Sequence, residues 1–306
     1  MPDEHRRGLL YGVLAYTMWG VFPLYWPLLE PSTPVEILAH RMVWSLVAVL
    51  AILALRRHWS WFLPLVRQPR TMALLGLAGL IIAVNWGTYI FAVNTGRVVE
   101  SALGYFINPL VSVVFGVLLL RERLRRWQWV AVGLGAVAVV VLTVDYGRPP
   151  WIALVLAMSF GTYGLVKKKA NVGAAESLTM ESLVLLVPAL AYLGTLEASG
   201  TASFGAHGIG HTLMLLSSGI VTAVPLLCFS AAAIRIPLTV IGLLQYIAPV
   251  LQFLCGVLIV REAMPVGRWI GFAIVWVALA VFTWEGLRHA HHTRREEQRR
   301  LAHATR

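Results

Sequence analysis

The residues best suited to chemistry in this sequence are a few ionisable side chains inside long apolar stretches. Arg41 is the one base in such a stretch, and Glu100 and Glu181 are acids near the ends of two others. An ionisable group in a hydrocarbon layer is costly unless it is paired or hydrated, so its presence points to a function. Arg41 fits either an anchor in an ion pair, for which Glu100 at the same face of the membrane is the expected partner, or a group that faces a substrate. Glu181 fits either a structurally satisfied carboxylate or a site of proton coupling, a role that Glu100 could share.

Polar and aromatic side chains recur at helical spacing near these groups. Ser101, Tyr105, Asn108 and Ser112 follow one another at steps of four, three and four residues, which places them on one face of a helix. A polar stripe does not face lipid, so it lies either in a helix contact or along a water-filled cavity. Rings beside amides suit small, mostly apolar substrates. Shorter groups of the same kind are Asn85 with Tyr89, Tyr16 with Trp19, and Phe160 with Tyr163.

Two prolines coincide with further polar positions. Pro109 and Pro249 each lack an amide donor and displace the carbonyl group four residues earlier, which frees the carbonyls of Tyr105 and Gln245. Tyr246 lies beside the second of these. Each of these prolines is consistent either with a helix kink needed for packing or with a position where a carrier bends and binds its substrate.

The patterns of known catalytic and metal sites are missing from the sequence. It contains no HExxH, GxSxG or GxxxxGK[ST] pattern and no pair of carboxylates at helical spacing within an apolar stretch. Cys228 and Cys255 lie in apolar runs, and the histidines of the C-terminal tail lack companions at ligand spacing. We therefore expect no enzyme activity, no metal and no cofactor. Without a nucleotide-binding loop, any transport would be driven by a gradient.

The composition identifies the elements that carry these residues. Of the 306 residues 58% are hydrophobic and 13% are charged, against roughly 25% charged in a soluble domain. A membrane-crossing helix takes about 20 apolar residues, and the sequence predicts an all-α integral membrane protein with ten of them. The ten stretches are 8–27, 34–55, 71–93, 98–120, 127–145, 150–166, 176–197, 211–234, 237–260 and 266–285.

The basic residues predict the orientation of these helices. With the N-terminus inside, 20 of the 25 Lys and Arg residues fall in inner segments and four in outer loops, and Arg41 lies within a span. Basic loops stay in the cytoplasm, so both termini are expected there. The net charge of +11 is spread over loop ends rather than gathered in one stripe, which argues against nucleic acid. The basic tail, residues 286–306, is expected to lie in the cytoplasm and to be attracted to anionic lipids.

The two halves of the sequence match each other at a shift of 140 residues. Residues 8–145 and 150–285 each contain five predicted helices, and because five is odd, the second unit must cross the membrane in the opposite direction. Two inverted halves around one central cavity allow alternating access. The pairs that carry most weight are Gly79 with Gly219, Pro109 with Pro249, Gly116 with Gly256, Arg121 with Arg261, Glu122 with Glu262, and Trp129 with Trp269.

The sequence as a whole resembles a known family. Its two five-helix units, each with a Pro-containing helix followed by Glu, are similar to the EamA domains of the drug/metabolite transporter superfamily. The string from Glu100 to Pro109, with Asn85-Trp86 and Gln245-Tyr246 elsewhere, resembles the RarD branch. The resemblance extends over essentially the whole chain. It implies a ten-helix carrier in the cytoplasmic membrane that moves small metabolites or drugs, usually outward, and it implies no particular substrate.

We therefore expect a secondary transporter of a small molecule, with an export direction and a cavity between the repeats. A membrane receptor or an assembly subunit without flux is the alternative that the residues leave open, and an intramembrane enzyme is the weaker one. Gly267 and Gly271 form a GxxxG pattern, which fits a helix contact or a homodimer.

Overall fold

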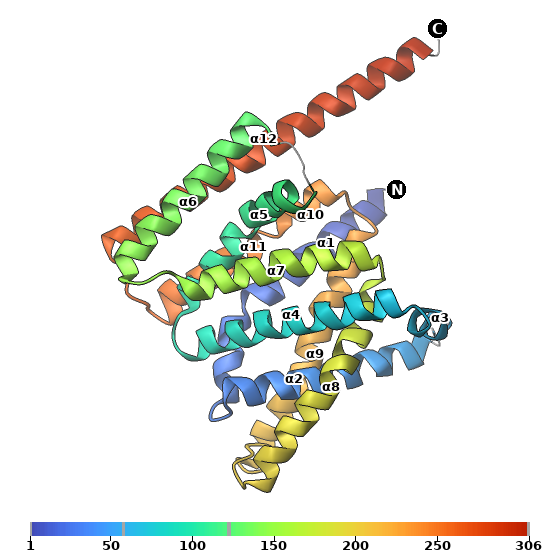
Figure 1. Ribbon diagram of the computed structural model, residues 1–306, viewed down its shortest axis with the longest axis vertical. Helices are drawn as coiled ribbons and strands as arrows, with labels where there is room; N and C mark the ends of the chain where they lie inside the picture. Colours follow the sequence, from blue (N-terminus) through green and yellow to red (C-terminus); the bar gives the residue numbers. More distant parts are fainter. Residues whose placement is uncertain (1, 57–58, 121–123, 305–306) are drawn as a thin grey trace. The chain divides into compact units, whose positions relative to one another are not determined.

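The computed structural model describes residues 2–56, 59–120 and 124–304, and throughout these ranges the regular structure is helical (Figure 1). Long apolar runs favour this outcome, because a helix satisfies its own backbone hydrogen bonds. In chain order the elements are α1 (Pro2–Gly20), the 3₁₀ turns η1 (Phe22–Leu24) and η2 (Trp26–Leu29), α2 (Pro34–Arg56), α3 (Phe62–Val66), α4 (Pro69–Asn94), α5 (Val98–Leu120), α6 (Arg126–Tyr146), α7 (Trp151–Ala170), α8 (Ala174–Ala198), α9 (Gly208–Ala233), α10 (Leu238–Leu244), α11 (Ile247–Leu254), the π-helical turn η3 (Cys255–Ile259) and α12 (Val266–Ala304).

Eight helical segments in the described part of the chain are long and apolar enough to cross a membrane. They are α2, α4, α5, α6, α8, α9, the stretch Val240–Ile259 and the first part of α12. The helices α1 and α7 are of similar length, but each combines an apolar stretch with a charged end. The structure thus establishes an all-helical protein with many candidate spans.

Three predicted helices differ in detail from the structure. The tenth continues as α12 to Ala304 rather than ending at residue 285. The first ends at Gly20 rather than at residue 27, because Pro23 and Pro27 lack amide donors and the chain continues as η1 and η2. The ninth is divided at Gln245 and Tyr246 into α10 and α11. That break lies four residues before Pro249, where the proline leaves a carbonyl group without its amide, whereas α5 continues through Pro109.

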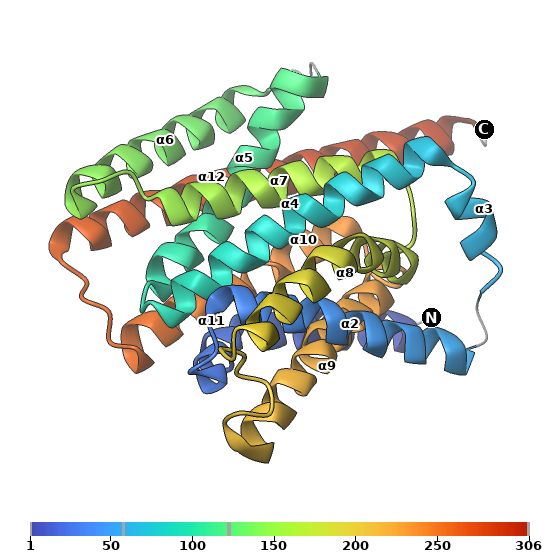
Figure 2. The ribbon, with the colours of Figure 1, turned by 60° about the horizontal axis from the view of Figure 1, so that its bottom comes forward.

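The chain forms two compact units. The first contains Met1–Tyr105 and Ile152–Glu262, and the second contains Phe106–Trp151 and Ala263–Arg306. In the second unit α6 and the first part of α12 lie side by side (Figures 1 and 2). The ion pairs of this unit join Arg268 to Asp145 at 3.1 Å and Arg125 to Glu285 at 3.3 Å.

Small residues allow α6 and α12 to approach closely. A Cβ atom on Gly267 would lie 2.6 Å from a carboxylate oxygen of Asp145, and one on Gly271 would lie 2.4 Å from Cγ of Leu142. The GxxxG pattern therefore serves a contact within the chain, as small residues do between membrane helices. The expected homodimer receives no support from this pattern.

In the first unit, α2 packs against α8 and α9, and α4 packs against α8 (Figure 2). A Cβ atom on Gly219 of α9 would lie 2.2 Å from the carbonyl oxygen of Trp44 in α2. One on Gly79 of α4 would lie 3.1 Å from the carbonyl oxygen of Glu181 in α8. Gly79 and Gly219 occupy equivalent positions in the 140-residue repeat. Each lies in the third predicted helix of its own half and contacts the second predicted helix of the other half.

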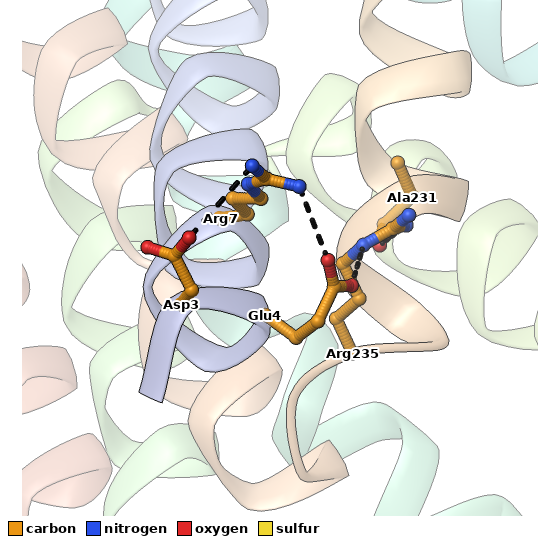
Figure 3. Close-up of polar contacts among 5 residues, drawn as sticks. All are labelled: Asp3, Glu4, Arg7, Ala231 and Arg235. Carbon is orange, nitrogen blue, oxygen red and sulfur yellow. Dashed lines mark hydrogen bonds and ion pairs between the residues drawn. The ribbon is translucent and has the colours of Figure 1, made fainter. Parts of the chain in front are cut away.

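The start of α1 lies against the chain that follows α9 (Figure 3). Glu4 accepts from Arg235 Nε at 2.9 Å and pairs with Arg7 at 3.3 Å, while Arg7 lies 3.8 Å from Asp3. These side chains are largely exposed, and exposed ion pairs contribute little to stability. The tighter contact is at Gly8, where an added Cβ atom would lie 2.7 Å from Cβ of Arg235.

We expect Gly219→Ala to lower the melting temperature of the detergent-purified protein. The added methyl group would meet the α2 backbone, which cannot yield as a flexible side chain would, and overpacking of this kind costs about 1–3 kcal/mol. Gly210→Ala in the same helix is the control, because nothing lies within 4 Å of its added Cβ atom. Equal melting temperatures for the two variants would contradict the close crossing of α2 and α9.

Candidate functional site

Arg41 lies in the first two turns of α2, and its side chain is buried at 2% exposure. Its Nε donates a hydrogen bond to Thr222 Oγ1 of α9 at 2.9 Å. Three rings surround the guanidinium, with centroids 3.8 Å (Trp86), 4.9 Å (Trp26) and 5.9 Å (Phe22) from its central carbon. Such rings attract a cation through their negative faces, so Arg41 is held by an aromatic cage and one hydroxyl group.

The expected pairing of Arg41 with Glu100 is wrong. Glu100 is 1% exposed and accepts a hydrogen bond from the backbone amide of Ile152, at 3.2 Å, in the first turn of α7. The first amides of a helix have no partner within it, and the positive end of its dipole favours a carboxylate. Arg41 Nη1 has no hydrogen-bond partner among the described residues.

Asn85 joins three helices of the first unit. Its Nδ2 donates to the carbonyl oxygen of Leu156 at 3.0 Å and to Ser159 Oγ at 2.9 Å, both in α7. Its Oδ1 accepts from the Tyr105 hydroxyl of α5 at 3.2 Å. Asn85 is 1% exposed, and the cost of burying an amide is met because both ends of the group are hydrogen-bonded.

A chain of aromatic rings connects this network to α7. Ring centroids lie 5.7 Å apart for Tyr89 and Tyr105, 6.1 Å for Tyr105 and Phe160, and 6.2 Å for Phe160 and Tyr163. The first two contacts are edge-to-face, a favourable arrangement of aromatic quadrupoles. Tyr89 is 3% exposed, and its hydroxyl group has no hydrogen-bond partner in the part of the chain that the structure describes.

Glu181 lies at the other end of this chain of rings and is 2% exposed. Its Oε2 accepts from the Tyr163 hydroxyl at 3.1 Å, and its Oε1 accepts from Lys167 Nζ at 2.9 Å and from Ser177 Oγ at 2.5 Å. Lys167 also donates to Ser177. The geometry is that of a carboxylate satisfied by three neighbours, and proton coupling at Glu181 stays a prediction.

Tyr16 and Trp19 of α1 form a separate aromatic cluster with Phe229 of α9. Their ring centroids lie 5.3 Å apart, and each lies 6.1 Å or less from that of Phe229. Gln252 Nε2 donates to the carbonyl oxygen of Trp19 at 3.1 Å. These rings pack with Ile236 and other apolar side chains, and Trp19 also packs against the core cluster that contains Phe22 and Tyr89.

The remaining predicted residues lie at helix interruptions or in the second unit. Gln245 and Tyr246, both half-buried, form the break between α10 and α11, and Pro249 is buried just after it. Asn108 and Pro109 belong to the second unit. Asn108 is half-buried, and its Oδ1 lacks a partner within the described ranges. Roles for these five residues stay predictions.

Several residues of these networks escaped the sequence analysis as site residues, among them Lys167, Ser177, Trp86 and Thr222. Lys167 lies four residues after Tyr163, and Ser177 four before Glu181, so helical spacing could have placed both beside the carboxylate. Trp86 and Thr222 carried no such signal. Their contacts with Arg41 come from the crossing of three helices, which spacing along one helix cannot reveal.

A small hollow lies between α2, α8 and α9. It is lined by apolar side chains such as Val49, Leu178 and Leu226, with Ser230 as the polar exception. Ala223 on its wall directly follows Thr222, the partner of Arg41.

Comparison with known proteins identifies the family of this chain. A model of the EamA-like transporter family matches residues 6–144. Protein RarD of Streptomyces exfoliatus is 61% identical over 293 residues, which cover 95% of this chain and 93% of that protein. Protein RarD of Escherichia coli (strain K12) is 40% identical over 284 residues, with 93% and 96% covered.

Two more distant relatives complete the comparison. The chloramphenicol-sensitive protein RarD of Pseudomonas aeruginosa is 30% identical over 290 residues, which cover 92% of this chain and 95% of that protein. A crystal structure of a protein that is 22% identical aligns with a TM-score of 0.60 over 90% of this chain and 97% of its own. At that identity the likeness concerns the fold alone.

We expect Lys167→Met to lower the melting temperature, because it leaves the Glu181 carboxylate buried without its cation. Breaking a buried pair costs about 3–5 kcal/mol, and the partial exposure of Lys167 favours the lower end. Adding Glu181→Gln should recover most of the loss, since the uncompensated charge is then removed. Lys168→Met, at an exposed neighbour, is the control. A double variant no more stable than Lys167→Met would contradict the pairing.

Proposed function

We propose a mechanism on one premise: the chain belongs to the EamA-like transporter family and, within it, to the RarD branch. It is therefore a membrane transporter of the drug/metabolite superfamily, a multi-pass protein that in bacteria lies in the cytoplasmic membrane. What it carries, in which direction and by what cycle are the subjects of the proposal.

The proposed function is secondary transport of a small metabolite or drug-like molecule by alternating access, in the outward direction that the family resemblance implies. The observation that carries the proposal is that buried polar side chains from both halves of the sequence meet in the first unit. Arg41 bonds Thr222, and Asn85 bonds Ser159. Buried polar groups inside a membrane protein mark substrate pathways, and sites between inverted repeats are typical of secondary transporters.

Ten membrane-crossing helices in two inverted repeats are part of this proposal. Adding α1 and α7 to the eight candidate spans gives ten. The reciprocal contacts of Gly79 with α8 and of Gly219 with α2 support two related halves. The positions of Lys and Arg residues support an orientation with both termini in the cytoplasm.

The orientation predicts which loops a membrane-impermeant thiol reagent reaches. In a variant that lacks Cys228 and Cys255, we expect a cysteine at Ser199 to be labelled in intact cells. A cysteine at Gln68 should be labelled only after the cells are permeabilised, because that loop is placed inside. Both positions are exposed, so each serves as the other's control for reactivity. Labelling of both in intact cells would contradict the proposed topology.

The energy source in this proposal is an ion or substrate gradient. The sequence contains no nucleotide-binding loop, and Glu181 is the candidate proton site because a buried carboxylate touches Lys167, Ser177 and Tyr163. Glu100 is the second candidate. A receptor or assembly subunit with the same fold would show no flux in vesicles, which separates that alternative from a carrier.

Flux in proteoliposomes tests the proposal directly. We expect saturable counterflow of labelled chloramphenicol or labelled benzoate. Asn85→Leu should reduce this flux more than about tenfold, because the variant loses the hydrogen bonds of Asn85 and the substrate is then positioned less well. Tyr163→Leu should act in the same direction. Thr162→Val is the matched control, because this hydroxyl group bonds only the Met158 carbonyl of its own helix. Equal flux in empty liposomes would eliminate the carrier assignment for these probes.

A further inference from the structure

We propose that the substrate is a small organic carboxylate, which Arg41 binds through its unpartnered Nη1 while the neighbouring aromatic and aliphatic side chains contact the apolar body of the molecule. This inference rests on the proposed transport function, because it names the substrate class of the same site.

The charge of Arg41 has no counter-ion in the part of the chain that the structure describes. Other cations are paired there: Lys167 with Glu181, Arg125 with Glu285 and Arg268 with Asp145. Arg41 takes part in no such pair, although it is 2% exposed. A guanidinium does not lose its proton in proteins, and an uncompensated buried charge is costly. A bound anion would supply the missing charge.

The contacts of Arg41 leave Nη1 of the guanidinium without a hydrogen bond from the described residues. Nε is used by Thr222, and the rings of Trp86 and Trp26 lie over the group at 3.8 and 4.9 Å. Nη1 is buried without a hydrogen-bond partner among the described residues. A carboxylate matches the planar fork of a guanidinium and forms short charge-assisted hydrogen bonds with it.

Two further donors of the same core cluster are also buried without partners. Trp26 is fully buried, and its Nε1 bonds to nothing within the described ranges. The hydroxyl group of Tyr89 is in the same situation. Both rings belong to the cluster that contains Phe22. Hydrogen-bond donors without partners favour a ligand with acceptor oxygen atoms, and a carboxylate has two such atoms.

The apolar surroundings decide between organic and inorganic anions. Around these donors the cluster consists of aliphatic and aromatic side chains, including Leu29 and Ile90. Inorganic phosphate would expose its remaining oxygen atoms to carbon, which is unfavourable. A neutral amide would leave the guanidinium uncompensated. A carboxylate on a flat apolar body satisfies both the charge and the rings.

The test is ligand-induced thermal stabilisation of the full-length protein, purified in detergent. The probes are benzoate, phenylacetate and indole-3-acetate, each compared with its primary amide, with inorganic phosphate as a further probe. We expect at least one carboxylate to bind about tenfold more tightly than its amide, the ratio expected for a charge-assisted hydrogen bond. Arg41→Gln should abolish this preference and Arg41→Lys should weaken it. Arg126→Gln, at an exposed position, should retain it.

The melting temperature without ligand separates a binding role from a structural one. Arg41→Gln should not lower it, because the substitution removes a buried charge that lacks a counter-ion. A structural anchor would instead lose stability on substitution. Should Arg41→Gln fail to yield folded protein, the comparison of Arg41→Lys with the unaltered protein on the same probes decides the question.

Several outcomes would overturn the inference: stabilisation by none of the carboxylates, equal affinity for amides, Arg41-dependent binding of phosphate alone, or unchanged preference in Arg41→Gln. The proposed transport can fail separately. Arg41-dependent carboxylate binding without flux of any probe would sustain the ligand class and reject the carrier. Saturable flux of chloramphenicol without carboxylate binding would sustain the carrier and reject the ligand class.

Discussion

The requirement that every buried polar group find a partner inside the chain governs this structure. In a lipid bilayer no water is available to compensate an unbonded amide, hydroxyl or charge. Glu100 meets the requirement at the start of α7, Asn85 through α7 and Tyr105, and Glu181 through three side chains. Arg41 meets it only in part. Trp26 Nε1 and the Tyr89 hydroxyl group also lack partners among the described residues. Of these three groups only Arg41 carries a charge, and for that reason it is the group through which this framework is best suited to bind a ligand.

The same requirement explains how the helices are packed. Lipid tails are as apolar as the helix surfaces, so close backbone contact and interhelical hydrogen bonds must replace a hydrophobic drive. Glycines at the crossings of α2 with α9 and of α4 with α8 allow that contact. The hydrogen bond between Arg41 and Thr222 forms between the two helices that cross closely at Gly219.

The sequence predicted much of the fold because apolar length, proline and charge act locally. Nearly all helices begin or end close to the predicted positions, and the break before Pro249 lies where the missing amide requires it. Prediction failed where the result depends on which helices cross. The Arg41–Glu100 pair was inferred from a shared end of two helices, whereas the α7 amide attracted Glu100. Trp86 and Thr222 were missed for the same reason.

Lys167 connects two properties that are usually treated separately. On the proposed orientation it is one of the basic residues that retain a loop in the cytoplasm during membrane insertion, and in the folded chain it neutralises Glu181 at 2.9 Å. The insertion signal and the internal charge balance therefore share one side chain. A homologue with this lysine at a neighbouring position would still have a basic residue to orient the helix in the membrane, but Glu181 would lose its counter-ion. Substitution at position 167 is therefore limited by the need to neutralise Glu181 rather than by the requirements of membrane insertion.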